Sequence, residues 1–419
     1  MSAVVGSVSV PNDVPFLNVV DPKFRFSNPE VALAQARSWY AESPIGLLVL
    51  RYAEAQELLR DPRLTFNGKT YLEKNGIFDG PIYDWLVPMI SSRNGDDHRR
   101  LRGLVSRAFT PRMINNLRPF IRAIAEHLTD HLVSVRSCEF VDDFANKLPM
   151  AVMCRLLGVP EEDFDKFRTW TSDITFVFSL AHGGDLQARV EAAVVGLNGY
   201  VDSLMADKTA TPTDDLISAL IAVQQDGGSI SAEELRNLLV TLVFAAHDTT
   251  RYQLSNAMVA FAEHHDQWTL LAGRPELIEQ TVEEVMRLYP ATTSVGRFAA
   301  EDLEYNGLHI ARDTHILICV FAAQRDPRAS YDAASFDISI ARKTPPLQFG
   351  GGPHYCLGAA LARAELSEAL PILTSRLGPP SITGPVTWTP STGINGPQML
   401  PIHFGQPPQP ARSTRWNRP

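Results

Sequence analysis

Apolar positions recur every three to four residues through most of the segment 98–290, a spacing typical of helices that bury one face. The longest such run begins at Ser231 and Glu234, which have the spacing of a capping box, and continues to about His264. At 1.5 Å per residue, this helix is about 45–50 Å long. The pattern therefore predicts a mainly helical fold crossed by one long helix.

Short strands are predicted near both ends of the chain. Residues 45–60 have the pattern of an apolar strand followed by an amphipathic helix, and the Asn-Gly pair at 306–307 predicts a hairpin. The glycine- and proline-containing segment 71–95 is expected to be a long functional loop. Because no repeat or linker divides the body, we expect one domain over residues 1–404 and a Pro/Arg-rich tail at 405–419.

Composition narrows the class of protein. The 419 residues include 38 basic and 47 acidic side chains, and the formal charge of −9 argues against a nucleic-acid partner. The start lacks the pattern of a secretory signal, and no apolar run is long enough to span a bilayer. The four cysteines form no CxxC pair, which predicts neither a disulfide scaffold nor a zinc ribbon. We expect a cytoplasmic protein without a membrane anchor.

One cysteine lies in a distinctive loop. Cys356 is part of the stretch FGGGPHYCLG, whose glycines and proline exclude a helix, and a strong helix-forming sequence follows at once. Unpaired N–H groups at a helix start stabilise a thiolate. The ordinary alternative is an inert buried cysteine, but the pattern FxxGxHxCxG is too long and specific for that reading.

This pattern resembles the haem-binding loop of the cytochrome P450 monooxygenases. The resemblance implies a helical prism that holds haem b between the long helix and the helix after the cysteine, with Cys356 as the axial thiolate on iron. The neighbouring residues that it implies as haem contacts are Phe349, Gly350, His354, Leu357 and Gly358.

Two further stretches carry cations. His98 and Arg102 are spaced i and i+4 on one helix face, which alone fits a solvated basic surface equally well. In the family this spacing holds a haem propionate, and Arg297 resembles a second propionate ligand. Pro346 occupies the place of a further family histidine, so one propionate contact is expected to be missing.

Glu284 and Arg287 have the spacing of a helical ion pair. An isolated pair of this kind is usually a solvated one, but its position resembles the buried Glu-Arg pair of the family. The family usually adds an arginine just before a phenylalanine further along. Ser335 stands there, before Phe336, so the third member of the network is in doubt.

The middle of the long helix contains an acid and a hydroxyl at Asp248 and Thr249, preceded by the small residues Ala245 and Ala246. Taken alone, Thr249 bonding to a carbonyl one turn earlier and Asp248 facing solvent would explain them. The stretch resembles the oxygen-activation segment of the family, with Ala246 in place of glycine. The resemblance implies that Asp248 and Thr249 deliver protons.

The sequence indicates the class of substrate only in general terms. By analogy, contacts are expected in the largely apolar segments 71–90 and 175–182, which favours a lipophilic small molecule. His247 is interpreted as a packing or substrate-contact residue. The expected substrate contacts are Phe244, His247, Thr292, Val295 and Ile394.

The resemblance implies a monooxygenase that inserts one atom of O2 into its substrate. Since the chain has no room for a fused electron-transfer domain, a separate ferredoxin and an NAD(P)H-dependent reductase are expected to supply electrons to a monomer. A haem-thiolate sensor and a peroxide-driven enzyme are the alternatives, and the Asp-Thr pair argues against both. The arginines expected to dock the ferredoxin are Arg99, Arg100, Arg107, Arg112 and Arg363.

Overall fold

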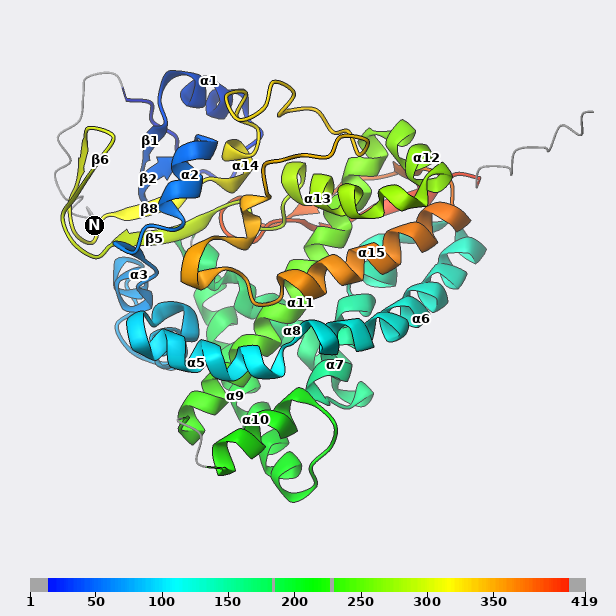
Figure 1. Cartoon of the computed structure of the whole chain (residues 1–419), viewed down its shortest axis with the longest axis horizontal. Helices are drawn as coiled ribbons and strands as arrows, with labels where there is room; N and C mark the ends of the chain where they lie inside the picture. Colours follow the sequence, from blue (N-terminus) through cyan, green and yellow to red (C-terminus); the bar gives the residue numbers. More distant parts are fainter. Residues whose placement is uncertain (1–13, 183–184, 227–229, 407–419) are drawn as a thin grey trace, which may run out of the picture.

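The computed structural model describes residues 14–182, 185–226 and 230–406 (Figure 1). Its α-helices are α1 (Pro29–Arg37), α2 (Tyr52–Leu58), α3 (Gly68–Lys74), α4 (Pro81–Leu86), α5 (Gly95–Ala108), α6 (Pro111–Val135), α7 (Lys147–Leu157), α8 (Phe164–Ile174), α9 (Leu186–Ala210), α10 (Leu216–Gln225), α11 (Ala232–Glu263), α12 (His265–Gly273), α13 (Ile278–Leu288), α14 (Val320–Ala323) and α15 (Ala359–Arg376).

The strands are short. They are β1 (Tyr40–Ser43), β2 (Gly46–Val49), β3 (Leu64–Thr65), β4 (Ser137–Glu139), β5 (Val295–Ala299), β6 (Leu303–Tyr305), β7 (Leu308–Ile310), β8 (His315–Ile318), β9 (Pro380–Ile382), β10 (Thr387–Trp388), β11 (Pro397–Met399) and β12 (Pro401–Phe404). The described residues beyond 404 are Gly405 and Gln406, and the rest of the predicted tail lies outside the described ranges.

The predicted long helix is α11, and its capping box is present. The Ser231 hydroxyl accepts from the Glu234 N–H at 3.1 Å, and the Glu234 carboxylate accepts from the Ser231 N–H at 3.0 Å. Its 32 residues give a length of about 48 Å. Figure 1 shows α11 passing through the middle of a roughly triangular molecule, with α15 and α6 in front of it. Helix α11 is therefore buried along most of its length.

The largest sheet has the strand order β1-β2-β8-β5-β3, in which only β2 and β8 are parallel. The predicted strand and helix of residues 45–60 are β2 and α2. The predicted hairpin is β6–β7, whose turn residues Asn306 and Gly307 have φ values of 48° and 76°. This sheet carries Arg297 on β5 directly opposite Ile316 on β8.

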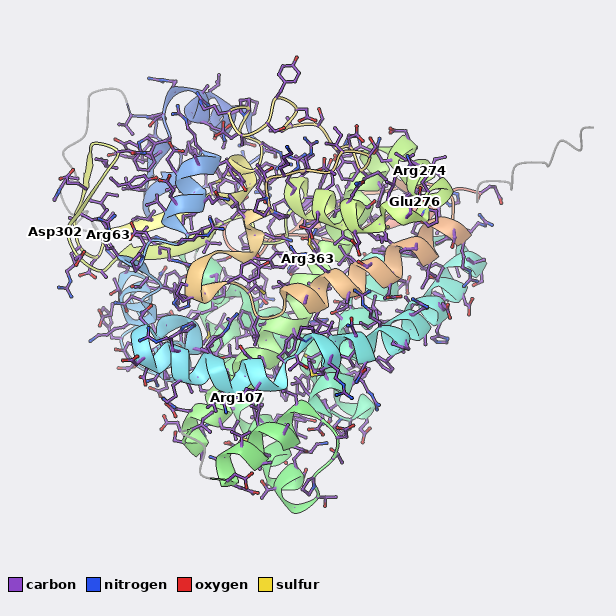
Figure 2. All side chains as sticks on the ribbon, viewed as in Figure 1. Arg63, Arg107, Arg274, Glu276, Asp302 and Arg363 are labelled. Carbon is purple, nitrogen blue, oxygen red and sulfur yellow. The ribbon has the colours of Figure 1, made fainter. Side chains whose placement is uncertain are left out.

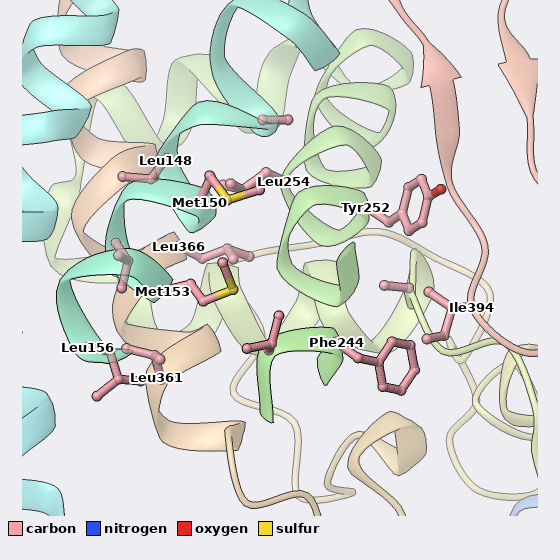
Figure 3. Close-up of a cluster of buried hydrophobic side chains, with 14 of the residues drawn as sticks. Leu148, Met150, Met153, Leu156, Phe244, Tyr252, Leu254, Leu361, Leu366 and Ile394 are labelled. Atoms are coloured by element: carbon pink, nitrogen blue, oxygen red, sulfur yellow. The ribbon is translucent and has the colours of Figure 1, made fainter. Parts of the chain in front are cut away.

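The main core lies around α11. Figure 3 shows Leu148, Met150, Met153 and Leu156 of α7 lying beside Leu254 of α11 and Leu361 and Leu366 of α15. These side chains are buried and belong to one continuous hydrophobic cluster. The cluster fixes the long helix relative to the helix that follows the cysteine loop. No helix within the described ranges has both the length and the apolar character needed to cross a membrane.

The prediction of a long loop over residues 71–95 is wrong in part. Helices α3 and α4 and a single 3-10 turn at Ile90–Ser92 occupy much of it. The Asn67 side chain caps α3 by accepting from the Thr70 N–H at 3.1 Å, and Pro81 starts α4. Buried Trp85 and Leu86 then hold α4 in the core. Packing thus stabilises helices that are too short to show a clear period in the sequence.

Candidate active site

A partly open cavity of about 1640 Å³ lies between α11, the cysteine loop and the β5–β8 edge of the sheet. Pockets for single small ligands usually measure about 300–1,000 Å³. The cavity therefore has room for a cofactor together with a substrate. Predicted residues that line it are Phe244, Ala245, Thr249, Thr292, Val295, Arg297, Phe349, Gly350, His354, Cys356 and Ile394.

The cysteine loop presents its thiol to this cavity. Two 3-10 turns, Leu347–Phe349 and Gly352–His354, precede Cys356, and Gly350 and Gly352 have φ values of 71° and 62° that L side chains rarely adopt. The Cys356 N–H donates to the Phe349 carbonyl at 2.8 Å and closes the loop. Helix α15 begins three residues later, as the sequence predicts.

The electrostatics of Cys356 fit a metal ligand. Burial raises the pKa of its thiol above the usual value, while the N–H groups of Gly358 and Ala359 and the guanidiniums of Arg102 and Arg363 act in the opposite direction. Cys356 is an exposed residue, and it lines the cavity. A bound cation would supply the remaining stabilisation that the thiolate needs.

Basic side chains lie around the cysteine loop. Arg297 is buried, and among the described residues its guanidinium donates only to the Gly296 carbonyl, at 2.9 Å. Burial lowers the pKa of Arg297 to about 10. The rings of His98 and His354 lie tilted at 41° to each other with their centroids 4.2 Å apart. Burial, followed by the charges of His98, Arg297 and Arg102, lowers the pKa of His354 to about 4.

No carboxylate of the described residues forms an ion pair with Arg102, whose Nη2 donates to the Tyr355 carbonyl at 2.6 Å. Arg102 is half-buried and Arg297 is buried, and a guanidinium without an anionic partner is costly in proportion to the water that it has lost. A dianionic group beside the thiol would compensate Arg102 and Arg297 together. The residues present therefore fit haem, whose iron would face Cys356 and whose two propionates would face the cations.

Helix α11 forms another wall of the cavity. Thr249 lines it. The Thr249 hydroxyl donates to the Ala245 carbonyl at 2.9 Å, which is the bond to the preceding turn that the sequence suggested for this residue taken alone. Ala245 also lines the cavity and leaves space for a flat ligand. The predicted cofactor residues that are absent from the cavity wall are His98, Arg102, Ala246, Leu357 and Gly358. Ala246 and Leu357 pack instead against the main core.

Asp248 lies on the other side of α11 and is fully buried, so it does not face solvent. Its Oδ2 accepts from the Thr175 hydroxyl at 2.8 Å and pairs with Arg251 at 3.1 Å. Burial alone would raise the pKa of Asp248, but the charge of Arg251 and the hydrogen bonds from His247 and Thr175 lower it below the usual value. Asp248 therefore carries a charge inside a polar cluster behind the cavity wall.

The expectation that His247 contacts substrate is wrong. Its side chain is fully buried on the Asp248 side of α11 and is not part of the cavity wall. The ring nitrogens lie 2.9 Å from the Thr171 hydroxyl and 3.3 Å from the Asn146 carbonyl. The remaining expected contacts, Phe244, Thr292, Val295 and Ile394, all line the cavity.

The Glu284–Arg287 pair is buried and has a third member that the sequence reasoning missed. Arg287 binds both Glu284 oxygens at 2.7 and 2.9 Å. Arg342 binds the same carboxylate at 3.0 and 3.2 Å and pairs with Asp332 at 2.6 Å. Ser335, which stands where the third arginine was sought, contributes its carbonyl to Arg287 at 2.8 Å. The doubt about the network is therefore removed.

We expect Arg342→Ala to lower the free energy of unfolding by about 3 kcal/mol, because it leaves Glu284 and Asp332 short of a cation. The midpoint of urea unfolding measures this loss. Arg328→Ala is the matched control, since Arg328 pairs with Asp326 through a half-exposed side chain and is expected to cost less than about 1 kcal/mol. Equal midpoints for the two variants would contradict the prediction.

Cavity residues that the sequence did not single out include Phe66, His315 and Gln348. His315 stacks on Phe298 with centroids 4.7 Å apart and bonds the Ile45 carbonyl at 2.9 Å. These residues come from the sheet edge and the loops around it. Their place in the wall depends on how distant segments pair, and no local spacing signals it.

Comparison with known proteins places this geometry in a family. The sequence model of the protein family described as "Cytochrome P450" matches residues 272–376. "Luteothin monooxygenase" of Streptomyces thioluteus is 43% identical over 394 residues, which is 94% of this chain and 97% of that protein. "Vitamin D(3) 25-hydroxylase" of Pseudonocardia autotrophica is 34% identical and covers 91% of this chain and 94% of its own length.

Solved structures agree with the fold. The crystal structure of CalO2 superposes with a TM-score of 0.85 at 28% identity, covering 94% of this chain and 100% of that chain. The structure of P450BioI in complex with an acyl carrier protein carrying hexadec-9Z-enoic acid gives a TM-score of 0.83 at 27% identity. It covers 91% of this chain and 98% of that one.

Proposed function

Because this chain belongs to the cytochrome P450 family and is a haem-thiolate monooxygenase that uses O2, we propose that it oxidises luteothin or a lipophilic molecule of similar shape. The observation that carries this substrate proposal is the 43% identity with luteothin monooxygenase over nearly the full length of both chains. The apolar part of the cavity wall, with Phe66, Phe178, Phe244 and Ile394, suits such a substrate.

We further propose that the cofactor is haem b, held by Cys356 and by the cations next to it. Haem bound through a thiolate supplies the reductive activation of dioxygen. Arg297 and Arg102 would neutralise the propionates, His98 and His354 would donate hydrogen bonds to them, and Phe349 would pack beside the thiolate. The Thr249 hydroxyl would hold a proton at the cavity wall, where Ala245 leaves space for oxygen and substrate. Asp248 would resupply that proton from behind the helix.

The substrate proposal is tested by adding luteothin to the haem-loaded protein and following the Soret band, with vitamin D3 and mycinamicin IV as comparison compounds named for relatives. We expect luteothin to shift the band at the lowest concentration. Turnover under ¹⁸O2 with NADPH, ferredoxin and reductase should then add one labelled oxygen atom. Absence of a Soret shift with luteothin would contradict the proposal that luteothin is the substrate. Turnover with hydrogen peroxide alone would favour the peroxide-driven alternative.

The proposed electron donor is a separate ferredoxin, reduced by an NAD(P)H-dependent reductase. Of the arginines expected to dock it, Arg99, Arg100 and Arg363 form ion pairs with Asp96, Glu234 and Glu283. Arg107 and Arg112 are exposed and have no ion-pair partner among the described residues. Figure 2 labels Arg107 on α5, the helix that bonds the cysteine loop through Arg102. These two arginines are therefore the proposed centre of the docking surface.

We expect Arg107→Gln with Arg112→Gln to slow reduction by ferredoxin about 3- to 10-fold at low salt, and to flatten the dependence of this rate on ionic strength. Stopped-flow formation of the reduced carbon monoxide adduct measures the rate. Arg274→Gln is the control, because Arg274 pairs with Glu276 at 2.9 Å on another part of the surface (Figure 2). If the double variant and the control were reduced at the same rate and with the same salt dependence, the ferredoxin would bind at another part of the surface.

A further inference from the structure

His315 begins strand β8, lines the cavity and has no part in the chemistry described so far. Its partner on β5 is Phe298, and Leu317 of β8 pairs with Gly296 of β5. Because every second residue of a strand points to the same face, these four positions share one face of the sheet, and all four line the cavity. Arg297 lies between Gly296 and Phe298 and points to the opposite face. His315 is therefore separated by the sheet from the cation proposed to hold the cofactor.

Two contacts fix the plane of the His315 ring. The ring stacks on Phe298, with centroids 4.7 Å apart and planes 22° from parallel, and its Nδ1 lies 2.9 Å from the Ile45 carbonyl. Ile45 belongs to the turn between β1 and β2, which the Ser43 hydroxyl closes by donating to the Gly46 carbonyl at 2.7 Å. Gly46 packs so closely on the backbone carbonyl of His315 that a Cβ would clash there. The ring is therefore held in place before a ligand binds.

The contact with Ile45 determines which ring nitrogen of His315 carries the proton. A backbone carbonyl accepts hydrogen bonds and cannot donate them, so Nδ1 carries the N–H. Burial, together with the charge of Lys74, lowers the pKa of His315 to about 4, although the bond to Ile45 acts in the opposite direction. The imidazole is therefore neutral near pH 7, and its Nε2 is an acceptor without a proton.

The Nε2 atom of His315 borders the cavity. It has no hydrogen-bond partner among the described residues, and it is not one of their unpaired atoms that are sealed from solvent. It lies beside Gly296 of the cavity wall, because a Cβ built on Gly296 would be 3.1 Å from it. An acceptor in this position loses a hydrogen bond unless water or a ligand supplies a donor.

The surroundings of Nε2 favour one kind of ligand group. On the sheet side the wall is apolar, with Phe298, Leu317 and Ile45 next to the imidazole. An unprotonated ring nitrogen repels the lone pairs of an ether, a carbonyl or a carboxylate, but it accepts from a hydroxyl or an N–H group. Since the ring is already fixed, binding such a donor costs little ordering of the protein.

We propose that His315 is a specificity-determining residue whose Nε2 accepts a hydrogen bond from a hydroxyl or N–H group of a lipophilic substrate. The inference rests on the proposed function, because it takes this cavity as the substrate site. The donor group binds at the sheet, and the apolar remainder of the molecule extends along the wall that Phe244 and Thr249 also line. His315 thereby sets which part of an elongated substrate reaches Thr249.

The test titrates the Soret band of the haem-loaded protein with two probes that differ in one donor, dodecan-1-ol and 1-methoxydodecane. His315→Phe keeps a stacked ring but removes Nε2, so we expect the ratio of the two dissociation constants to change about 3- to 10-fold in favour of the ether. Gly296→Ala should change the ratio in the same direction, because its methyl group covers Nε2 and leaves the imidazole in place. His309→Phe is the matched control, since His309 is exposed, pairs with Glu304 at 2.9 Å and lies outside the cavity wall.

A second measurement uses the wild-type protein and does not require that a variant folds. In the ferrous carbon monoxide complex labelled with ¹⁵N-histidine, the Nε2 resonance of His315 should be that of an unprotonated ring nitrogen. Dodecan-1-ol should move this resonance, and 1-methoxydodecane should leave it in place. The resonance is identified by its absence in His315→Phe or by its displacement in Gly296→Ala.

A ratio of dissociation constants that stays at the wild-type value in both His315→Phe and Gly296→Ala would overturn the proposal. So would an Nε2 atom that carries a proton or does not respond to the alcohol. Absence of a Soret shift with luteothin would contradict the proposed substrate instead, and would leave the comparison of alcohol and ether intact. The failures of the two proposals are therefore distinguishable.

Discussion

Cys356→His is expected to abolish the absorption band at about 450 nm of the reduced carbon monoxide adduct, because that band reports thiolate ligation. Cys356 is the cysteine that lines the cavity within the described residues, and the cations of Arg102 and Arg297 lie nearby. The spectrum of the reduced, carbon monoxide-treated protein measures the effect. Monooxygenation should be lost together with the band.

The other three cysteines supply the controls. Burial raises the pKa of Cys138 and Cys319 to about 12, and Cys154 is buried in the main core. None of the three forms a disulfide, and none lines the cavity, so alanine at any of these positions should leave the band in place. A variant of Cys356 that still binds haem and shows the band would disprove this residue as the ligand.

The sequence predicted those parts of the site that local spacing determines. The cysteine loop and the helix after it follow from glycines, a proline and a helix-forming run that are contiguous. His98 and Arg102 share a face because a helix places residues i and i+4 together. Patterns of this kind can be read from the sequence because their residues are neighbours in one local element, whatever that element packs against.

Arg342 could not be found in the same way. It meets Glu284 from 58 residues further along the chain, through a segment without regular structure at this point. The search for a third arginine beside Phe336 failed because Ser335 contributes a backbone carbonyl there. Contacts of this kind depend on the path of an irregular segment, which hydrophobic periodicity does not describe.

His247 was misplaced for a different reason. A helix that faces solvent on one side shows its buried face as an apolar stripe, but α11 is buried on nearly all sides. Each residue advances about 100° around the helix, so Thr249 and His247 are directed to different surroundings. The sequence could not tell which of these surroundings is the cavity. The packing of α8 and the Asn146 segment against α11 decides it.

Thr249→Ala is expected to retain substrate binding and NADPH consumption, while much of the consumed oxygen appears as hydrogen peroxide. The Thr249 hydroxyl is the side-chain donor that α11 presents in the cavity wall. Without this hydroxyl, no side chain of α11 within the described residues positions a proton at the cavity wall, so protons would add at the wrong place and release hydrogen peroxide. Product, peroxide and oxygen uptake per NADPH measure the coupling. Thr241→Ala is the matched control, because Thr241 makes the same bond to the carbonyl four residues earlier, at 2.8 Å, but lies outside the cavity wall.

Asp248→Asn should fail differently from Thr249→Ala. The amide keeps acceptor capacity for Thr175 and Arg251 but cannot transfer a proton, so turnover should fall by about 10²-fold or more with a larger solvent isotope effect. Coupling should change less than turnover, because the Thr249 hydroxyl remains in the cavity wall. Asp173→Asn is the control, since Asp173 forms an ion pair with Arg189 at 2.5 Å in a more exposed position. If Asp248→Asn and Asp173→Asn were equally active, and Thr249→Ala were as well coupled as Thr241→Ala, these two residues would serve only the packing of α11. The polar cluster behind the cavity would then stabilise the fold without moving protons.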